Sequence, residues 1–369
     1  MTERSVEIIG MIGTENVSEI HSSTGEFDPG FARRFAQAHE ESGFDRVLIG
    51  HSSSTPDGLQ VAAHVAAHTE KLRFLVAHRP GFVSPTVAAR MFATLDRFSD
   101  GRSSIHIISG GSDTEQRRDG DHADKHQRYQ RSGEFIEVLR KAWTSTEPFD
   151  HHGEFYTIED ARSEILPLQS PHPPVFFGGS SQDAYRIGGA QADVFALWGE
   201  PLAQTREQIA AVTSAAYAAG REAPPSFSVS FRPIIAETDD AAWERAHAIL
   251  DAIKTGRGHS FTGTRYSAVS PTNQGSQRLL EAAAAGEHHD RALWTATAAA
   301  SGARGNSTAL VGSPATVAAA LLDYVDIGVD HLLIRGYDPF ADVVDWGREL
   351  IPLVRAGVAE RSGSLAAAR

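Results

Sequence analysis

Short apolar runs alternate with amphipathic stretches along this chain, and the alternation predicts strands and helices in turn. Leu72 to Ala77 and Ile105 to Ile108 are two apolar runs of strand length. Ser84-Pro85 lies between them and predicts the start of a helix, because serine caps a helix and proline suits its first position. The interval from residue 72 to 110 therefore reads as strand, helix and strand, which favours a parallel sheet.

The helix of this unit carries an apolar stripe at helical spacing. We expect that stripe to pack on the sheet, because a surface helix buries its apolar face. Its members are Val87, Met91 and Leu95, with Ala88 and Phe92 beside them.

Six further strands are predicted by the same pattern, at residues 6–12, 47–49, 175–177, 194–197, 227–235 and 331–334. A long helix is expected over about 127–143, and a short strand-like excursion over 149–159. Eight strand and helix alternations favour a TIM (β/α)8 barrel over an open doubly wound sheet, so the predicted fold class is α/β. The predicted organisation is one barrel domain over residues 1–369.

Two segments depart from this rhythm. Residues 257–307 are polar and Gly/Ser-rich at first, and an alanine-rich helix is expected afterwards, so we expect a mobile insertion or lid there. The alanine-rich tail at 361–369 is expected to be frayed.

Composition narrows the class of protein. The chain of 369 residues has a formal net charge of −13 and no cysteine. The acidic balance argues against a nucleic-acid partner, and the missing cysteine excludes disulfides and thiolate chemistry. No run of about 18 apolar residues predicts a membrane span, and the charged N-terminus does not resemble a signal peptide, so a cytoplasmic protein is expected.

Polar side chains follow three of the predicted strands. His51, His78 and His106 each lie late in a strand or just past it, and Ser109 follows the same strand as His106. Ligands of parallel α/β folds bind beyond the carboxyl ends of strands, so these positions predict a pocket. Local hydrogen bonding is the alternative for the three imidazoles. The other histidine pairs lack a metal-site pattern, and no metal is expected.

A glycine and serine turn, Gly178-Gly179-Ser180-Ser181, joins a buried strand to a helix start. Backbone N–H groups and the helix dipole favour a phosphate at such a place. A tight turn with an ordinary serine cap is an equally open interpretation. No GxGxxG or P-loop pattern is present, which disfavours a Rossmann or P-loop nucleotide site.

Arginines and aromatic residues mark the later strands. Arg232 lies late in one strand, and Arg335 and Tyr337 end the last, where a guanidinium fork suits an oxyanion. A salt-bridged arginine at the barrel rim is the alternative. Trp198 either walls a pocket or caps the core, and Arg304 either closes over an anion or contacts solvent. No Ser-His-Asp order or GxSxG elbow favours a hydrolase.

Several longer motifs resemble one family. The strings FLVAHRPGFVSPTVAARMFATLDRFSDGR, HQRYQRSGEF, PPVFFGGSS, LWGEP, TALVG and RGYDPF resemble the alkanesulfonate monooxygenases among the bacterial luciferase-like flavin enzymes, over about residues 5–356. The resemblance implies a TIM barrel that binds reduced FMN (FMNH2) from a separate NAD(P)H-dependent flavin reductase. It also implies an O2-dependent cleavage of the C–S bond of a small anionic organosulfonate, giving an aldehyde and sulfite. A homodimer or homotetramer is expected.

By this resemblance, Tyr129 and the turn at 178–181 would hold the FMN phosphate, with His106 and Ser109 near the isoalloxazine. Arg304 would pair with the sulfonate or the peroxyflavin as the lid closes. The predicted site residues are, for catalysis, Arg304, Tyr337, Trp198, Arg232, His51 and His78, and, for the cofactor, His106, Ser109, Tyr129, Gly178, Gly179, Ser180 and Ser181.

The chain departs from the family pattern at two strand ends. HSSSTPDG stands where the family has a cysteine, near Thr55, and Ser230-Phe231-Arg232 replaces an Arg-x-His pattern. The added hydroxyl and imidazole groups suit a polar substrate, such as the sulfosugar sulfoquinovose, better than an alkyl chain. The alternatives are a luciferase-like monooxygenase of a sulfone or aldehyde, and a flavin- or F420-binding oxidoreductase without oxygenase activity.

Overall fold

The computed structural model describes residues 6–255, 273–303, 305 and 308–367. The chain divides into two compact units. The first unit is Met1–Val47, Leu197–Ile209 and Ser226–Arg369, and the second is Leu48–Ala196 and Ala210–Pro225. Arg304 and the first part of the expected lid, residues 257–272, lie outside the described residues.

Eight strands of the described chain alternate with helices in the order of a TIM (β/α)8 barrel, which confirms the predicted fold class. Parallel pairing joins β1 to β13 and β13 to β9, and likewise β3 to β4, β4 to β7 and β7 to β8. The eight strands are β1 (Glu7–Ile12), β2 (Arg46–Ile49), β3 (Arg73–His78), β4 (Ser103–Ile107), β7 (Val175–Gly178), β8 (Val194–Trp198), β9 (Ser226–Ile235) and β13 (Val329–Ile334).

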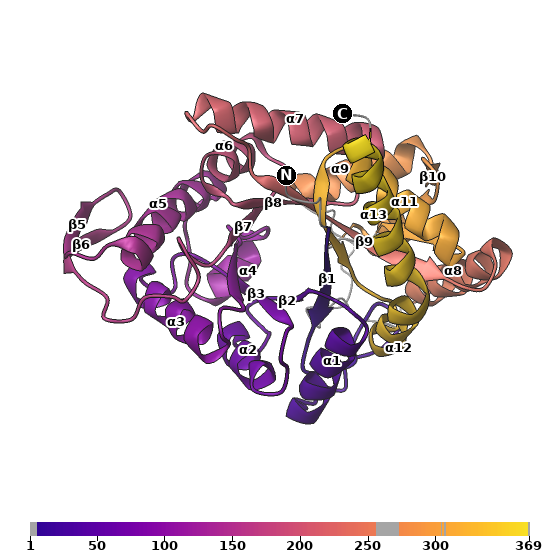
Figure 1. Cartoon of the computed structure of the whole chain (residues 1–369), viewed down its shortest axis with the longest axis horizontal. Helices are drawn as coiled ribbons and strands as arrows, with labels where there is room; N and C mark the ends of the chain where they lie inside the picture. The colour runs from indigo at the N-terminus through magenta and orange to yellow at the C-terminus, as the bar shows by residue number, and fades with distance from the viewer. Residues whose placement is uncertain (1–5, 256–272, 304, 306–307, 368–369) are drawn as a thin grey trace. The chain divides into compact units, whose positions relative to one another are not determined.

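In the first unit, β9 is buried along nearly its whole length, and its two halves pair with different strands. Val229 to Phe231 pair with β13, while Arg232 to Ile235 pair with β12. The elements of this unit that are labelled in Figure 1 or described below are α1 (Pro29–Glu41), α8 (Asp239–Lys254), α9 (Gln274–Ala285), β10 (His288–His289), β11 (Leu293–Trp294), α10 (Ala296–Ser301), β12 (Ala309–Gly312), α11 (Pro314–Asp326), α12 (Pro339–Asp345) and α13 (Ile351–Ala367).

Much of the expected insertion has regular structure where it is described. Helices α9 and α10 lie within residues 273–303, and β11 pairs antiparallel with β12, which in turn extends the sheet at β9. Helix α13 likewise continues to Ala367, into the tail that was expected to be frayed. Secondary structure therefore occupies the later part of the first segment and most of the second.

The second unit contains the other strands with their helices. The strand-like excursion predicted at 149–159 is an antiparallel hairpin of β5 (Phe149–His152) and β6 (Thr157–Ala161). Asp124 and Gln127 form a capping box that starts α5 two residues before the predicted helix. The helices are α2 (Gly58–Ala66), α3 (Pro85–Phe98), α4 (Asp113–Arg118), α5 (Lys125–Thr144), α6 (Gln182–Gln191) and, shared with the first unit, α7 (Leu202–Ala218).

The expected inner face of α3 is wrong in part. Val87 and Met91 are 38% and 37% exposed, whereas Phe92 and Leu95 are buried. Both sides of this helix are apolar, so the 3.6-residue period alone favoured the wrong stripe. The buried face instead consists of Ala88, Ala89, Phe92, Ala93, Leu95 and Asp96.

Helices α4, α12 and α13 were not predicted from the hydrophobic pattern. Helix α4 lies in a very polar stretch and has six residues, and α12 and α13 follow the last predicted strand. None of the helices within the described residues is long and apolar enough to span a membrane.

Candidate functional site

The turn after β7 places two glycines and two serines at the start of α6. Ser181 is the N-cap, and its side chain accepts a hydrogen bond from the N–H of Ala184 at 3.3 Å. Gly179 has φ +144°, and a Cβ there would lie 2.8 Å from both the Tyr129 hydroxyl and the Ala184 Cβ. The backbone of the turn therefore closely approaches a tyrosine that α5 supplies, and this approach requires glycine.

Tyr129 adds a hydroxyl to this turn. Its side chain is buried, and burial raises the pKa of the phenol, although a hydrogen bond with Ser181 opposes that rise. The hydroxyl thus stays protonated and remains a donor at neutral pH. Donor groups at the start of a ten-residue helix suit a phosphate, so the turn fits the predicted role.

His106 on β4 lies beside the same turn. A Cβ at Gly178 would be 3.5 Å from the Cε1 atom of His106. Burial lowers the pKa of His106 to about 4, so its ring is neutral at pH 7. Within the described residues, its buried Nδ1 atom has no hydrogen-bond partner. A neutral imidazole with one unused nitrogen can give or accept one hydrogen bond to a ligand, depending on its tautomer.

Ser109 is held by α5. Its hydroxyl lies 2.9 Å from that of Ser132, and its carbonyl accepts a hydrogen bond from Nε of Arg128 at 3.0 Å. The structure thus places Ser109 near the amino-terminal half of α5. Its predicted contact with an isoalloxazine stays a prediction.

His51 and His78 form a second neutral group in this unit. Burial is the main cause that lowers the pKa of His78 to about 4, and the charge of His51 lowers it further. Burial is also the main cause that lowers the pKa of His51, and the charge of Arg79 adds to this effect. In the part of the chain that is described, the buried Nε2 atoms of both rings and the buried Ser53 hydroxyl lack hydrogen-bond partners.

Glu115 of α4 joins the ends of two strands, and sequence reasoning missed it. Its carboxylate accepts hydrogen bonds from the N–H of Ser53 at 2.7 Å and from Nη2 of Arg79 at 3.0 Å. Ser112 caps this helix, and acidic residues occupy its first turn. That pattern, which is typical of a helix start, could have revealed α4 in the sequence.

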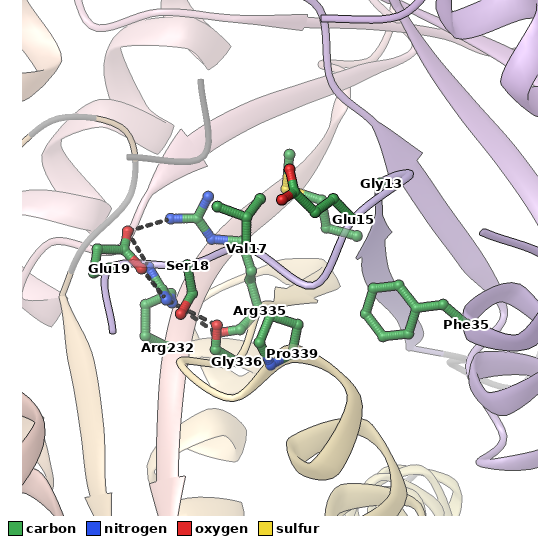
Figure 2. Close-up of a pocket in the computed structure, with 11 residues that line it drawn as sticks. Gly13, Glu15, Val17, Ser18, Glu19, Phe35, Arg232, Arg335, Gly336 and Pro339 are labelled. Carbon is green, nitrogen blue, oxygen red and sulfur yellow. Dashed lines mark hydrogen bonds and ion pairs between the residues drawn. The ribbon is translucent and has the colours of Figure 1, made fainter. Parts of the chain in front are cut away.

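In the first unit, Arg232 is bonded within the protein. Its guanidinium donates to both carboxylate oxygens of Glu19, at 2.9 and 2.7 Å (Figure 2). It also donates to the carbonyls of Arg335 and Gly336, both at 2.8 Å, and its side chain is 0% exposed. Arg232 is therefore a salt-bridged arginine, which was the alternative interpretation of the sequence. A direct contact between Arg232 and a substrate would require these bonds to break.

Tyr337 lies beneath the same guanidinium. The central carbon of the Arg232 guanidinium is 3.8 Å from the centre of the Tyr337 ring, and the tyrosine is fully buried. Burial is the largest cause that raises the pKa of its phenol. Tyr337 therefore packs against the guanidinium of Arg232. Its catalytic role stays a prediction.

Glu19 is the main site residue that the sequence analysis did not identify. Burial alone would raise the pKa of this carboxyl, but the charges of Arg232 and Arg335 outweigh it and lower the pKa to about 2. Glu19 comes from a polar loop, 213 residues away from Arg232 along the chain. No local pattern could join the two.

A small pocket, with a cavity volume of about 20 Å³, adjoins this cluster (Figure 2). Arg335, whose side chain is 15% exposed, donates to Glu19 at 3.1 Å and lines the pocket. The lining residues are Met11, Gly13, Glu15, Val17, Ser18, Glu19, Phe35, Arg232, Arg335, Gly336 and Pro339.

Trp198 packs against α9 and α10 of the same unit. It borders a cluster of Leu279, Ala298 and Ala303, and a Cβ at Gly275 would lie 2.9 Å from its ring. This packing agrees with the core-capping alternative. Within the described residues, no group of three or more acidic or histidine side chains is arranged to hold a metal ion.

A (β/α)8 barrel whose strand ends carry a phosphate-type turn and buried neutral imidazoles is typical of a cofactor-dependent enzyme. Residues 7–331 match the luciferase-like monooxygenase family, and the chain belongs to that family. The resemblance noted in the sequence is confirmed at this level, and so is the predicted enzyme class, a flavin-dependent monooxygenase.

Solved structures show the same fold at low identity. A riboflavin lyase with modified FMN and substrate riboflavin has 21% identity and a TM-score of 0.78, covering 95% of this chain and 92% of that one. EDTA monooxygenase from Chelativorans sp. BNC1 has 18% identity and a TM-score of 0.74, covering 98% of both chains. A long-chain alkane monooxygenase has 16% identity and a TM-score of 0.75, covering 96% and 92%.

Proposed function

We propose that this protein is the oxygenase of a two-component system that cleaves the C–S bond of an organosulfonate. Reduced FMN would come from a separate NAD(P)H-dependent reductase. The preferred substrate would be a sulfosugar such as sulfoquinovose, ahead of short alkanesulfonates. We also propose that the protein is cytoplasmic and that it forms a homodimer or a homotetramer.

The observation that carries the cofactor assignment is the close approach of Gly179 to Tyr129 at the start of α6. The Tyr129 hydroxyl, the Ser181 side chain and the backbone of the turn would hold the FMN phosphate. His106, with an unused buried nitrogen beside Gly178, would meet the edge of the isoalloxazine. The structure of riboflavin lyase that contains modified FMN supports the choice of flavin.

Bound reduced flavin would supply two electrons to O2, so that one oxygen atom enters the aldehyde and the other leaves as water. Sulfite is released as the C–S bond breaks. The role of the protein in this reaction is to bind and orient the reactants and to exclude water. The neutral imidazoles of His78 and His106 suit that part, because they offer hydrogen bonds without adding a charge.

The arginine cluster supports an anionic substrate. Arg335 and Arg232 line the pocket, and a guanidinium can pair with two oxygens of a sulfonate. The second unit supports a hydroxylated substrate, because buried polar atoms of His51, Ser53 and His78 have no hydrogen-bond partner within the described residues. Hydroxyl groups both donate and accept, and so match such atoms.

The decisive test is a sulfite-release assay of the purified protein with FMN, a flavin reductase, NADH and O2. We expect sulfite from hydroxylated sulfonates at higher kcat/KM than from alkanesulfonates. Absence of sulfite across the panel would reject the sulfonate assignment. Substrate-dependent O2 uptake with a sulfone or aldehyde would then favour the other monooxygenase function, and F420 binding without O2 uptake would favour the third alternative.

The cofactor site has its own test, which needs no substrate. Gly179→Ala would place a methyl group 2.8 Å from the Tyr129 hydroxyl, so FMN should bind more weakly, by about 1–3 kcal/mol. Gly220→Ala is the matched control, because Gly220 also has positive φ, +82°, but has open space around its Cβ position. Fluorescence titration with FMN measures both. Equal affinities in the two variants would remove the turn from the cofactor site.

A further inference from the structure

We propose that Arg128, at the start of α5, is the positioning residue of the cofactor site, and that it fixes the loop after β4 for contact with the isoalloxazine. This inference rests on the proposed function, because it concerns the flavin whose phosphate the turn from Gly178 to Ser181 would hold. Arg128 itself is given no contact with the flavin.

The guanidinium of Arg128 joins three parts of the second unit. Its Nε atom donates to the Ser109 carbonyl at 3.0 Å, and its Nη1 atom donates to the Ala123 carbonyl at 2.6 Å. Its Nη2 atom donates to the Asp113 carboxylate at 2.8 Å and lies 3.5 Å from the Gly110 carbonyl oxygen. The residue is only 2% exposed, so these bonds replace water around a buried cation.

Ser132 adds a second connection to the same loop. Its hydroxyl lies 2.9 Å from the Ser109 hydroxyl and donates to the Arg128 carbonyl at 2.8 Å. Residues four apart lie on one face of a helix, so Arg128 and Ser132 meet the loop after β4 together. Both the backbone and the side chain of Ser109 are therefore bonded to α5.

Tyr129 points to the other half of the cofactor site. Successive residues of a helix are about 100° apart around its axis, so Tyr129 and Arg128 point in different directions. The Tyr129 hydroxyl meets the turn after β7, where a Cβ at Gly179 would be 2.8 Å from it. The first turn of α5 thus contacts both the loop that would meet the flavin ring and the turn that would hold its phosphate. Two adjacent residues fix the spacing between these places.

The start of α5 is itself firmly held. Asp124 and Gln127 form a capping box there, and the Arg128 N–H donates to the Asp124 carbonyl at 3.0 Å. The Ala123 carbonyl, which Arg128 Nη1 contacts, directly precedes this cap. A guanidinium donates from three nitrogens of one rigid plane, so it can bond a helix start and a distant loop at once. A lysine ammonium carries its donors on a single atom and would not span the same oxygens.

The charge of Arg128 does not explain its place beside the phosphate turn. Burial is the largest cause that raises the pKa of Tyr129, and the charge of Asp183 raises it by more than the charge of Arg128 lowers it. The carboxylate of Asp113 also pairs with Arg128. Arg128 should therefore act on a bound flavin through the loop that it holds.

Fluorescence titration of the purified, flavin-free protein with FMN and with riboflavin tests the assignment, because riboflavin has the same ring without the phosphate. Arg128→Gln should weaken both by about 10-fold, since a misplaced loop loses about one hydrogen bond to the ring. Arg128→Lys should weaken both to a similar extent, because it keeps the charge without the planar fork. Arg140→Gln is the matched control on the same helix, where Arg140 pairs with Asp193 at 3.0 Å, and it should change neither affinity.

Ser132→Ala is a milder variant of the same connection. It removes one hydroxyl, so the fold should stay intact while both flavins bind roughly 2- to 5-fold more weakly. Amide hydrogen exchange without flavin gives a direct readout of the loop. Residues 107–112 should exchange faster in Arg128→Gln than in the wild type or Arg140→Gln, whereas residues 180–184 should not change.

Each outcome decides for or against the positioning role. Weaker binding of FMN alone would show that Arg128 acts on the phosphate through its charge, which contradicts the proposal. A folded Arg128→Gln with unchanged flavin affinities and unchanged exchange at 107–112 would also reject it. If Arg128→Gln does not fold, unchanged flavin affinities in Ser132→Ala would count against it.

The result is separable from that of the sulfite assay. Weaker binding of both flavins in Arg128→Gln, without sulfite release by the wild type from any sulfonate, would support the positioning role and reject the proposed reaction. Sulfite release by the wild type, with flavin affinities unchanged in Arg128→Gln, would overturn the positioning role and leave the reaction standing. Absence of flavin binding by the wild type would reject both.

Discussion

The arginine cluster of the first unit and the buried histidines His78 and His106 of the second unit differ in how their buried polar atoms are bonded. Arg232, Glu19 and Arg335 are charged and are bonded to one another and to backbone carbonyls. His78 and His106 are neutral, and each keeps one buried ring nitrogen without a partner in the described residues.

The difference follows from the energy of desolvation. A buried charge is very unfavourable unless it is paired, so a buried arginine is bonded before any ligand arrives. An unpaired neutral imidazole nitrogen is far less costly and can wait for a ligand. We therefore expect the fully buried charge to support the site and a ligand to bond at the neutral unpaired groups.

The largest effect should come from breaking the arginine cluster. Glu19→Ala leaves Arg232 buried without its counter-ion, and we expect the free energy of unfolding to fall by about 3–5 kcal/mol. Asp323→Ala breaks the exposed pair with Arg291 and should change it by less than about 1 kcal/mol. Urea denaturation at pH 7 measures both. Similar losses in the two variants would contradict the supporting role of Glu19.

The arginine cluster and His106 should also differ in the pH dependence of their effect on stability. The pKa of His106 is about 4 in the folded state and 6.5 ordinarily, so between these values the unfolded chain binds the proton that the folded chain does not. This residue therefore destabilises the fold as pH falls from 6.5 towards 4. His106→Asn should reduce the loss of stability between pH 7 and 5 by roughly 1–2 kcal/mol.

The Glu19 contribution has a different window. Its pKa is lowered from 4.5 to about 2, so its stabilisation is complete above 4.5 and is lost as pH falls towards 2. Urea titrations of wild type and His106→Asn at pH 7, 6 and 5 therefore isolate the histidine. An identical pH slope in both proteins would show that His106 is not held neutral.

The smallest effect concerns two serines that start helices in the same way. Ser313 accepts a hydrogen bond from the N–H of Thr316 at α11, whereas Ser84 makes no cap bond at α3 and lies 3.2 Å from the Thr86 hydroxyl. Ser313→Ala should lower the free energy of unfolding by about 1 kcal/mol, and Ser84→Ala by less than half of that. Equal losses would contradict this distinction.

Most of the barrel could be predicted from the sequence, because each buried strand is a short apolar run that ends in a polar or glycine residue. The eight predicted strands all appear, with ends shifted by a few residues, as in β4. The face of α3 could not be predicted, because Met91 and Phe92 are both apolar and only packing decides between them.

The candidate site was predictable only where its parts are close in sequence. The turn from Gly178 to Ser181 and the strand-end histidines follow strands directly, and so they could be identified. The ion pair of Glu19 with Arg232 joins residues 213 positions apart, and its acidic partner lies in a loop without periodicity. A sequence pattern shows which side chains can ionise, but not which of them neutralise each other.

Helix α4 links two loops of the second unit through one side chain. Its residue Glu115 holds the backbone after β2 and the arginine after β3, yet the helix itself belongs to the connection that follows β4. A single substitution at Glu115 would therefore alter two neighbouring loops together and leave every strand residue as it is.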